Sequence, residues 1–329
     1  MHTKMRYVTT AVAVIALTSL PACGGDSDSG SGGGSGDAKK ITLVQGIANE
    51  PFYISMECGA REEAAKHNVT LDVTAPQQWD VAQQTQVVNS VAAKRPDAVL
   101  IAPVHEESMA GPIKQMANNG TKIILVDTTL KDTSIGESRI SSDNKAGGIE
   151  AGKTLAKLVG DKGKVMALSV PPGTPTTDAR IAGFKEEIAK HPGIQLVKVE
   201  YIEGSDAAKA TTAVNATLAA HPDLAGIFAA NLTTGQGSAT ALKTAGKVGT
   251  TKLVGFDASP KQVEDLKAGI VQALIAQQPL EIGAEGVRQA LAAIDGKSVE
   301  KEVKTKMVSV TKDNMDDPDV SKYLYKSSC

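Results

Sequence analysis

Two kinds of hydrophobic pattern alternate along the chain: short runs rich in Val and Ile, and longer stretches with apolar residues every three or four positions. The short runs predict buried strands and the longer stretches predict amphipathic helices. In the first half, the strands are Ile41–Val44, Val69–Val73, Ala98–Ile101 and Ile123–Val126, and the helices are Tyr53–His67, Val81–Ala93 and Pro112–Asn119. In the second half, the strands are 164–168, 195–199, 226–228, 252–254 and 271–275, and the helices lie near 178–190, 206–220, 235–245 and 260–268. This alternation predicts an α/β fold with parallel, doubly wound sheets.

The two halves also share an internal repeat of the same sequence pattern. A Pro-Asp pair opens an apolar run at Pro96 and again at Pro222, and in both halves a helix and a Gly follow. A second apolar run then ends in Asp127 in the first half and in Asp257 in the second. The region after residue 38 is too long for one small core, so the repeated pattern predicts two similar α/β lobes.

Each of these two Asp residues follows directly on an apolar strand. Open α/β sheets bind ligands at the carboxyl ends of their strands, so each lobe is expected to offer one carboxylate to a shared cleft. Carboxylates accept charge-assisted hydrogen bonds and suit a molecule with many hydroxyl donors. The alternative is that Asp127 and Asp257 only cap the turns that follow them.

The first 22 residues have the composition of a secretion signal. Lys4 and Arg6 give a basic start, and the apolar stretch 8–20 is too short to span a bilayer comfortably. The sequence Leu-Pro-Ala-Cys that ends at Cys23 resembles the bacterial lipobox, in which the cysteine carries a diacylglyceryl group. Two acyl chains are enough for stable anchoring. The alternative is an ordinary signal peptide followed by a chance cysteine.

Residues 23–38 are expected to form a flexible tether behind the lipidated cysteine, because they are nearly all Gly, Ser and Asp. Cleavage of the signal removes Lys4 and Arg6 from the 35 basic residues and leaves 33 against 37 acidic ones. This acidic balance argues against a nucleic-acid partner. The extracytoplasmic compartment permits disulfides, and the sequence leaves two readings of Cys58 and Cys329 open. They either pair or are unrelated thiols, because the sequence gives no distance between them.

Six segments in order make the stretch from Ile41 to about Val310 resemble the ribose-binding-protein-like branch of the type 1 periplasmic binding proteins. The segments are 49–53 (NEPFY), 141–144 (SSDN), 178–184 (DARIAGF), 219–223 (AAHPD), 254–257 (VGFD) and 275–277 (IAQ). The resemblance implies two Rossmann-like lobes joined by three crossings near Ser141, Ala276 and Met307. After the signal 1–22 and the tether 23–38, the predicted parts are the first lobe 39–141 plus 278–306, the second lobe 142–277 plus 307–311, and the tail 312–329.

The resemblance also implies a sugar pocket. Phe52 and Tyr53 match the aromatic pair that sandwiches the sugar ring, and Asp127 matches the carboxylate of the first lobe. The polar groups of the second lobe and hinge fall on Arg180, Asn231, Asp257 and Gln277. From the residues alone, two alternatives stay open: the aromatic pair could belong to the core, and Arg180 could form a surface ion pair.

The chain departs from the family pattern at three pocket positions. Thr128 stands where the ribose binders have Arg, Glu50 where they have Asn, and Ser205 where they have an aromatic residue. Trp79 is a candidate to replace the lost stacking surface, although it is also the only Trp of the chain. The pocket is therefore more acidic, which favours a different aldose, a furanose or a linear polyol over ribose.

These observations predict an extracytoplasmic, lipid-anchored, monomeric substrate-binding protein of an ABC importer that closes on a neutral sugar or polyol and docks to its permease. A receptor of the same fold that serves a sensor protein is the alternative. A repressor would need an N-terminal helix-turn-helix where this chain has a lipobox. The five His are scattered without metal spacing, and no nucleotide or nucleophile motif is present, so neither a metal, a cofactor nor an enzymatic activity is expected.

Overall fold

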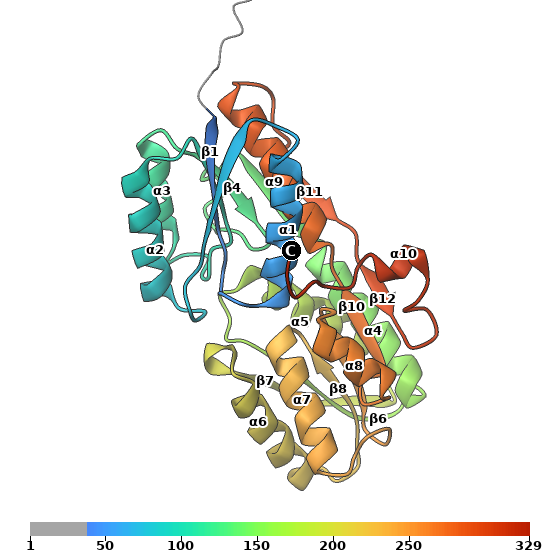
Figure 1. Ribbon diagram of the computed structural model, residues 1–329. Coiled ribbons are helices and arrows are strands. Elements are labelled where there is room, and N and C mark those ends of the chain that lie inside the picture. The colour runs from blue at the N-terminus through green and yellow to red at the C-terminus, as the bar shows by residue number, and fades with distance from the viewer. Residues whose placement is uncertain (1–37) are drawn as a thin grey trace, which may run out of the picture. The chain divides into compact units, whose positions relative to one another are not determined.

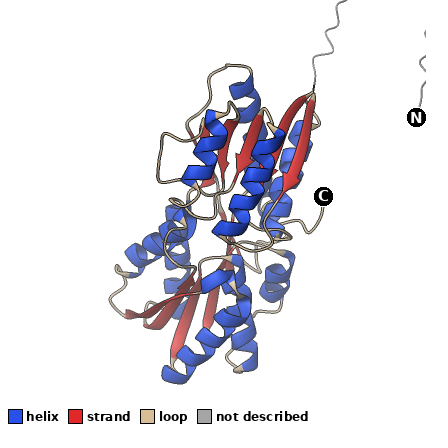
Figure 2. Cartoon of the chain, turned by 90° about the vertical axis from the view of Figure 1, so that its left-hand side faces the viewer, coloured by secondary structure: helices blue, strands red, loops and turns tan. Residues whose placement is uncertain are grey.

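The computed structural model describes residues 38–329. The predicted signal peptide, the lipidation site at Cys23 and all but the last residue of the tether lie outside the described residues. The described part contains two six-stranded sheets with helices on both faces of each (Figures 1 and 2). The predicted α/β class with two Rossmann-like lobes is confirmed.

The first sheet has the strand order β11-β5-β4-β3-β1-β2, and all neighbouring strands are parallel. Its strands are β1 (Lys39–Val44), β2 (Val69–Thr74), β3 (Ala98–Ile101), β4 (Lys122–Val126), β5 (Ser138–Ser142) and β11 (Glu302–Thr305). Its helices are α1 (Pro51–Ala64), α2 (Val81–Lys94), α3 (Ala110–Asn118) and α9 (Pro279–Ile294). Side chains of β3 alternate between the two faces: Leu100 lies in the cluster with α1 and α9, whereas Val99 and Ile101 lie in the cluster with α2 and α3.

The second sheet has the order β12-β10-β9-β8-β6-β7 and is parallel except for β12, which runs antiparallel to β10. Its strands are β6 (Gly163–Ser169), β7 (Ile194–Tyr201), β8 (Leu224–Ala229), β9 (Lys252–Phe256), β10 (Ala273–Ala276) and β12 (Val308–Val310). The helices of this half are α4 (Asn144–Val159), α5 (Pro175–Ile188), α6 (Ala207–Ala220), α7 (Leu232–Thr244), α8 (Pro260–Lys267) and α10 (Pro318–Ser321), with a 3-10 turn η1 (Glu203–Ser205).

Helices α4 and α9, which the sequence pattern did not predict, make their closest helix contacts at glycines. A Cβ on Gly148 of α4 would lie 2.0 Å from the Arg180 carbonyl oxygen of α5, and one on Gly283 of α9 would lie 2.0 Å from the Met56 carbonyl oxygen of α1. Glycine has a low helix propensity, which weighs against a helix when the sequence is considered alone, whereas in the fold its missing side chain lets two helices pack closely. Helix α7 begins at Leu232, not at Gly235, because Asn231 and Thr234 form a capping box.

The chain passes between the two sheets after β5, after β10 and between β11 and β12. These passages fall at the crossings expected near residues 141, 276 and 307, while the exact lobe boundaries stay a prediction. Within the described residues, every helix is too short or too polar to cross a membrane.

The C-terminal segment after β12 folds back onto the first half of the chain, and its end lies beside α1 (Figure 1). Cys329 forms a disulfide with Cys58 of α1, with a Cα–Cα distance of 5.2 Å. This pairing is the first of the two alternatives that the sequence left open.

Candidate functional site

One cavity is lined by residues that follow strands of both sheets. Its empty space is about 470 Å³, counting the part open to solvent. Nine of the ten side chains predicted for the site line this cavity: Glu50, Phe52, Tyr53, Trp79, Asp127, Arg180, Asn231, Asp257 and Gln277. The sequence pattern thus brings residues far apart in the chain to a single place.

Asp127 enters the cavity from the first sheet, directly after β4. Its φ is 63°, a left-handed conformation that is uncommon outside glycine, and its backbone N–H donates to the Ile140 carbonyl oxygen at 2.8 Å. The Tyr53 hydroxyl donates to Asp127 Oδ2 at 2.6 Å. Burial raises the pKa of Asp127 to about 6, although this hydrogen bond and the Arg180 charge both act to lower it. The same burial and the Asp127 charge raise the pKa of Tyr53 well above its usual value, so its hydroxyl stays protonated.

Asp257 enters from the second sheet, directly after β9, with the same unusual backbone. Its φ is 74°, and its N–H donates to the Ile275 carbonyl oxygen at 2.9 Å. Two groups donate to Asp257 Oδ1: the Gln277 amide at 2.7 Å and the Tyr325 hydroxyl at 2.9 Å. Neither Asp127 nor Asp257 caps a following turn by a hydrogen bond among the described residues, so the turn-capping alternative does not account for either side chain.

Arg180 of α5 is the basic group of the cavity and is only 4% exposed. Its guanidinium lies 3.7 Å from the centroid of the Phe256 ring. Nε donates to Asn144 Oδ1 at 2.8 Å, and one terminal nitrogen donates to the Ala230 carbonyl oxygen at 2.9 Å. These contacts are buried, and no ion pair involves Arg180 within residues 38–329, so the alternative of a surface ion pair is wrong. The stacked and doubly anchored guanidinium is held in one orientation toward the site.

Glu50 lies at the entrance of α1, just before Pro51, and its side chain makes no capping hydrogen bond. Burial raises its pKa to about 8, and the charges of Asp257 and Asp127 raise it further than the charge of Arg180 lowers it. At neutral pH, Glu50 is therefore mostly protonated and offers a hydroxyl donor as well as a carbonyl acceptor.

Three aromatic rings form the apolar wall. Phe52 and Tyr53 meet edge to face with centroids 5.2 Å apart, and Trp79 lies over Tyr53 with centroids 6.5 Å apart. Gly46 makes room for them, because a Cβ there would lie 2.3 Å from the Trp79 ring and 2.5 Å from the Tyr53 hydroxyl oxygen. Phe52 and Tyr53 belong to the core and also line the cavity, so the two roles weighed for them are not exclusive.

Polar groups of the second lobe complete the wall. Asn231 precedes α7, caps it through Oδ1 to the Thr234 amide, and donates through its own amide to Ser205 Oγ at 3.1 Å. Ser205, the position at which the resembling family has an aromatic residue, also lines the cavity and lies 2.6 Å from the Thr233 hydroxyl oxygen.

Thr128 is the predicted site residue that does not line this cavity. Its side chain is buried against a neighbouring hollow, and its hydroxyl has no hydrogen-bond partner in the described part of the chain. Its backbone N–H donates to the Val126 carbonyl oxygen at 2.8 Å. The tight turn after β4 sends successive side chains in different directions, so adjacency to Asp127 in sequence does not give adjacency in the site.

Sequence reasoning did not find the threonine-rich wall that follows β6. Val170 and Thr174 line the cavity from the connection between β6 and α5, and Thr176 and Thr177 line it from the first turn of α5. The available signal was their place at the carboxyl end of a strand, the same rule that pointed to Asp127 and Asp257. Tyr325 was also missed, since nothing in the local pattern of the tail places it beside Asp257.

The cavity contains carboxylates, one guanidinium, amides, hydroxyls and aromatic faces. Among residues 38–329, no group of three or more His, Cys, Asp or Glu side chains is placed to hold a metal ion. Acceptors prevail beside an apolar wall, and this combination suits a neutral molecule with many hydroxyl donors and some C–H surface.

Comparison with known proteins gives consistent results. The periplasmic binding protein domain family matches residues 41–298. The ribose import binding protein of Salmonella typhimurium is 32% identical over 297 residues, which cover 90% of this chain and 94% of that protein. A solute-binding protein of an ABC transporter from Agrobacterium vitis, solved with α-D-tagatopyranose, is 39% identical with a TM-score of 0.86 and covers 88% of this chain and 99% of that one. A carbohydrate transporter solute-binding protein from Agrobacterium radiobacter, solved with D-arabinose, is 27% identical with a TM-score of 0.82 and covers 87% and 98%.

Proposed function

Because the chain belongs to the periplasmic binding protein family, in its ribose-binding-like branch, we propose that it is the substrate-binding lipoprotein of an ABC importer for a neutral monosaccharide or polyol. The observation that carries the proposal is the pair of carboxylates, Asp127 and Asp257, which follow buried strands of two different sheets and line one cavity.

The hydrogen-bonding capacity of the site supports a hydroxylated ligand. Asp127 uses Oδ2 and Asp257 uses Oδ1 for protein donors, so one carboxylate oxygen on each has no protein donor within the described residues. Both residues line the cavity, and neither free oxygen is sealed from solvent, so each can accept a hydrogen bond from a ligand. Sugar hydroxyls can donate to both carboxylates only when the two lobes are closed around the ligand, which gives the ligand its preference for the closed form.

The charge of the site supports a neutral ligand. Asp127, Asp257 and a Glu50 that is mostly protonated at neutral pH face the single guanidinium of Arg180. The nitrogens of Arg180 that bond to Asn144 and Ala230 are already used by the protein. A carboxylate or phosphate would meet more negative than positive charge here, so acidic substrates are disfavoured.

The aromatic wall supports a ring or an extended carbon chain with one C–H face. Phe52, Tyr53 and Trp79 provide apolar contact on one side, whereas Asp257, Arg180 and Asn231 provide hydrogen bonds on the other. Of the related proteins named above, one is a ribose import binding protein, and the other two were solved with α-D-tagatopyranose and with D-arabinose. We therefore expect an aldose or ketose of five or six carbons, or the corresponding alditol.

Anchoring by a lipid on Cys23 and monomeric docking to an ABC permease belong to the same proposal. The lipobox-like sequence supports the first and the family supports the second. Intact mass of the membrane-extracted protein tests the anchor: a chain that starts at Cys23 with a diacylglyceryl mass supports it, and a Cys23→Ser variant that stays equally membrane-bound contradicts it.

The experiment that tests the proposed function is a binding screen of the secreted chain without its signal. Native mass spectrometry first detects any sugar retained from the cell, and a thermal-shift panel of pentoses, hexoses, ketoses and alditols then ranks ligands. We expect stabilisation by one or a few of these neutral compounds, since a ligand that binds only the folded state raises its stability. Stabilisation by sugar phosphates or sugar acids in place of the neutral compounds would contradict the proposal.

A further inference from the structure

The C-terminal segment 311–329 connects the two halves of the molecule outside the three hinge passages. It leaves β12 in the second sheet, packs Met315, Val320, Tyr323 and Tyr325 into the main core, and ends beside α1 of the first half (Figure 1). The burial of these four side chains shows that the segment is an integral part of the packed structure.

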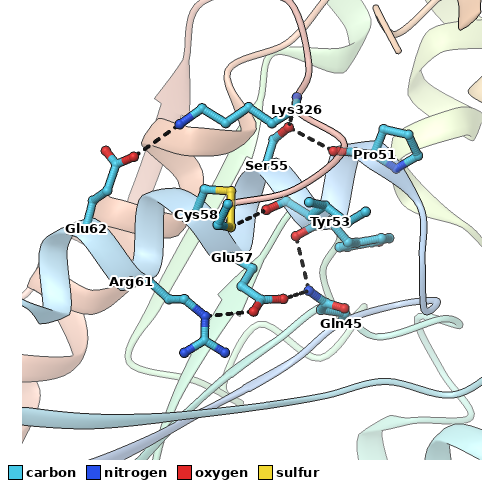
Figure 3. The surroundings of a disulfide bond; sticks show 11 residues. Gln45, Pro51, Tyr53, Ser55, Glu57, Cys58, Arg61, Glu62 and Lys326 are labelled. Atoms are coloured by element: carbon cyan, nitrogen blue, oxygen red, sulfur yellow. Dashed lines mark hydrogen bonds and ion pairs between the residues drawn. A yellow bond between two sulfur atoms is a disulfide. The ribbon is translucent and has the colours of Figure 1, made fainter. Parts of the chain in front are cut away.

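The end of this segment is attached to α1 by three contacts (Figure 3). Cys329 forms the disulfide with Cys58, the Lys326 backbone N–H donates to Ser55 Oγ at 2.7 Å, and Lys326 Nζ lies 3.2 Å from Glu62 Oε1. Cys58 is buried and Cys329 is exposed, so the disulfide can be reached by a small reductant from one side only.

Tyr325, the residue before Lys326, contacts the second half of the molecule as well as α1. The Tyr325 N–H donates to the Ala258 carbonyl oxygen at 3.0 Å, and its hydroxyl donates to Asp257 Oδ1 at 2.9 Å. The Gln277 backbone N–H in turn donates to the Tyr325 hydroxyl oxygen at 3.3 Å. The ring packs edge-on against Phe52 of α1, with centroids 5.7 Å apart. Tyr325 thus contacts site residues of both halves while it stays outside the cavity lining.

We propose that Tyr325 is a positioning residue for the ligand-binding carboxylate Asp257, and that the disulfide-tethered segment 311–329 is a fourth link between the lobes that holds its hydroxyl in place. The proposal rests on the proposed function, because it assigns Tyr325 to the site for the same ligand. Two donors on Oδ1 fix the plane of the Asp257 carboxylate and direct its second oxygen to the ligand. Loss of one donor frees the carboxylate to rotate, and the ligand must then order it on binding.

The first test is Tyr325→Phe, which removes the hydroxyl and keeps the ring against Phe52. We expect sugar affinity, measured by calorimetry, to fall about tenfold, in line with a hydrogen bond to a charged group. Tyr323→Phe is the matched control. Tyr323 is buried in the same segment, and within residues 38–329 its hydroxyl forms no hydrogen bond with a residue of the site. Equal affinity of Tyr325→Phe and wild type would overturn the proposal.

A double-mutant cycle separates positioning from a general structural effect. If Tyr325 acts through Asp257, Tyr325→Phe should weaken binding by less than twofold when Asp257→Ala, which removes the acceptor, is already present. A tenfold loss in both backgrounds would show that Tyr325 acts by another route and would overturn its role as a positioning residue.

The tether is tested by reduction. Treatment with tris(2-carboxyethyl)phosphine breaks the S–S bond to two thiols and oxidises the phosphine to its oxide, with water as the source of oxygen. We expect reduced wild type and the Cys58→Ser, Cys329→Ser double variant to bind sugar about threefold more weakly than oxidised wild type, and the double variant not to respond to reductant. Unchanged affinity of the reduced protein would refute the role of the tether.

A readout without ligand keeps this proposal distinguishable from the proposed function. Hydrogen exchange of the Gln277 backbone N–H reports its contact with the Tyr325 hydroxyl. We expect this exchange to accelerate in Tyr325→Phe and in the reduced protein but not in Tyr323→Phe. If wild type binds no neutral sugar, the proposed function fails, but the exchange measurement still tests whether the segment 311–329 holds Tyr325 against the second half. Unchanged exchange in Tyr325→Phe and in the reduced protein would overturn the link even if sugars bind.

Discussion

The two carboxylates of the site are equivalent in backbone position and different in environment. Asp127 and Asp257 both follow a buried strand, both have a positive φ, and both donate their N–H to the carbonyl of a neighbouring strand. Asp127 receives one side-chain donor, Tyr53, from its own half. Asp257 receives two, Gln277 at a crossing between the sheets and Tyr325 from the C-terminal segment. The fold supplies the position of each carboxylate, whereas distant residues supply its hydrogen-bond partners.

Because of this difference, ligand binding should depend on pH through Asp127 and on the contacts of the C-terminal segment through Asp257. Asp127 has a pKa raised to about 6, so its charge depends on pH near neutrality and on a single donor. The orientation of Asp257 depends on groups at the hinge and in a covalently attached segment. We infer that the first lobe holds the pH-sensitive contact and that the second lobe holds the contact sensitive to the linkage between the lobes.

The largest expected effect is loss of either carboxylate. Asp127→Asn and Asp257→Asn should each weaken sugar binding about 100-fold, or about 2.7 kcal/mol, because a buried charged acceptor for ligand hydroxyls is lost. Isothermal titration calorimetry measures the loss, and circular dichroism should show folded protein in both variants. Asp316→Asn, an exposed position, is the control. A variant that binds like wild type would remove its carboxylate from the site.

Removing the donor of the first lobe comes next. Tyr53→Phe should weaken binding about tenfold at pH 7, the effect expected for a hydrogen bond to a charged group. The Tyr53 hydrogen bond lowers the pKa of Asp127, so its loss should raise that pKa above about 6 and move the acid limb of binding toward neutral pH. Calorimetry from pH 5 to 8 measures both effects. An acid limb identical to that of wild type would contradict this account of Asp127.

Glu50→Gln should act at the alkaline side. Its pKa of about 8 means that wild type gains a third negative charge in the site between pH 7 and 9, so affinity should fall by no more than about tenfold, while Glu50→Gln should bind evenly across this range.

The raised pKa of Glu50 also predicts how the stability of the ligand-free protein changes with pH. The folded-state pKa of Glu50 is raised, so the stabilising effect of its neutral form is fully present below about pH 4.5 and is lost as pH rises through about 8. Thermal unfolding of Glu50→Gln should lack this decline. Parallel pH profiles of the variant and wild type would contradict it.

The smallest effect is expected at Thr128. Thr128→Val replaces a buried hydroxyl that has no partner in the described part of the chain with a methyl group of the same shape. Affinity should change less than about twofold, and the protein should become slightly more stable, because the cost of an unpaired buried hydroxyl is removed. Competitive binding and thermal unfolding measure these changes. A tenfold loss of affinity would instead place Thr128 in the site, as its match to a pocket position of the resembling family implies.

The sequence predicts the parts of this site that follow from strand order. Asp127 and Asp257 were predictable because an apolar run that ends in a polar residue marks the carboxyl end of a strand, and parallel strands bring these ends together. The resemblance then located Arg180 and Gln277. The strands β5 and β11 were not predicted, because one is rich in Ser and the other in charged residues at an edge of its sheet.

The contacts of the C-terminal segment were beyond sequence reasoning for a different reason. Tyr325 lies 68 positions after Asp257, and Cys329 lies 271 positions after Cys58. No periodic pattern links such residues, so only tertiary packing brings them together. The same holds for Gly46, whose missing side chain is explained only by the two rings that occupy the space around it.

The most direct test of this account is a crystal structure of the protein with the neutral sugar that stabilises it most. We predict one sugar molecule in the cavity, with hydroxyl oxygens about 2.6–3.0 Å from a carboxylate oxygen of both Asp127 and Asp257. A sugar that contacts only one of the two carboxylates, or that binds elsewhere on the protein, would contradict it.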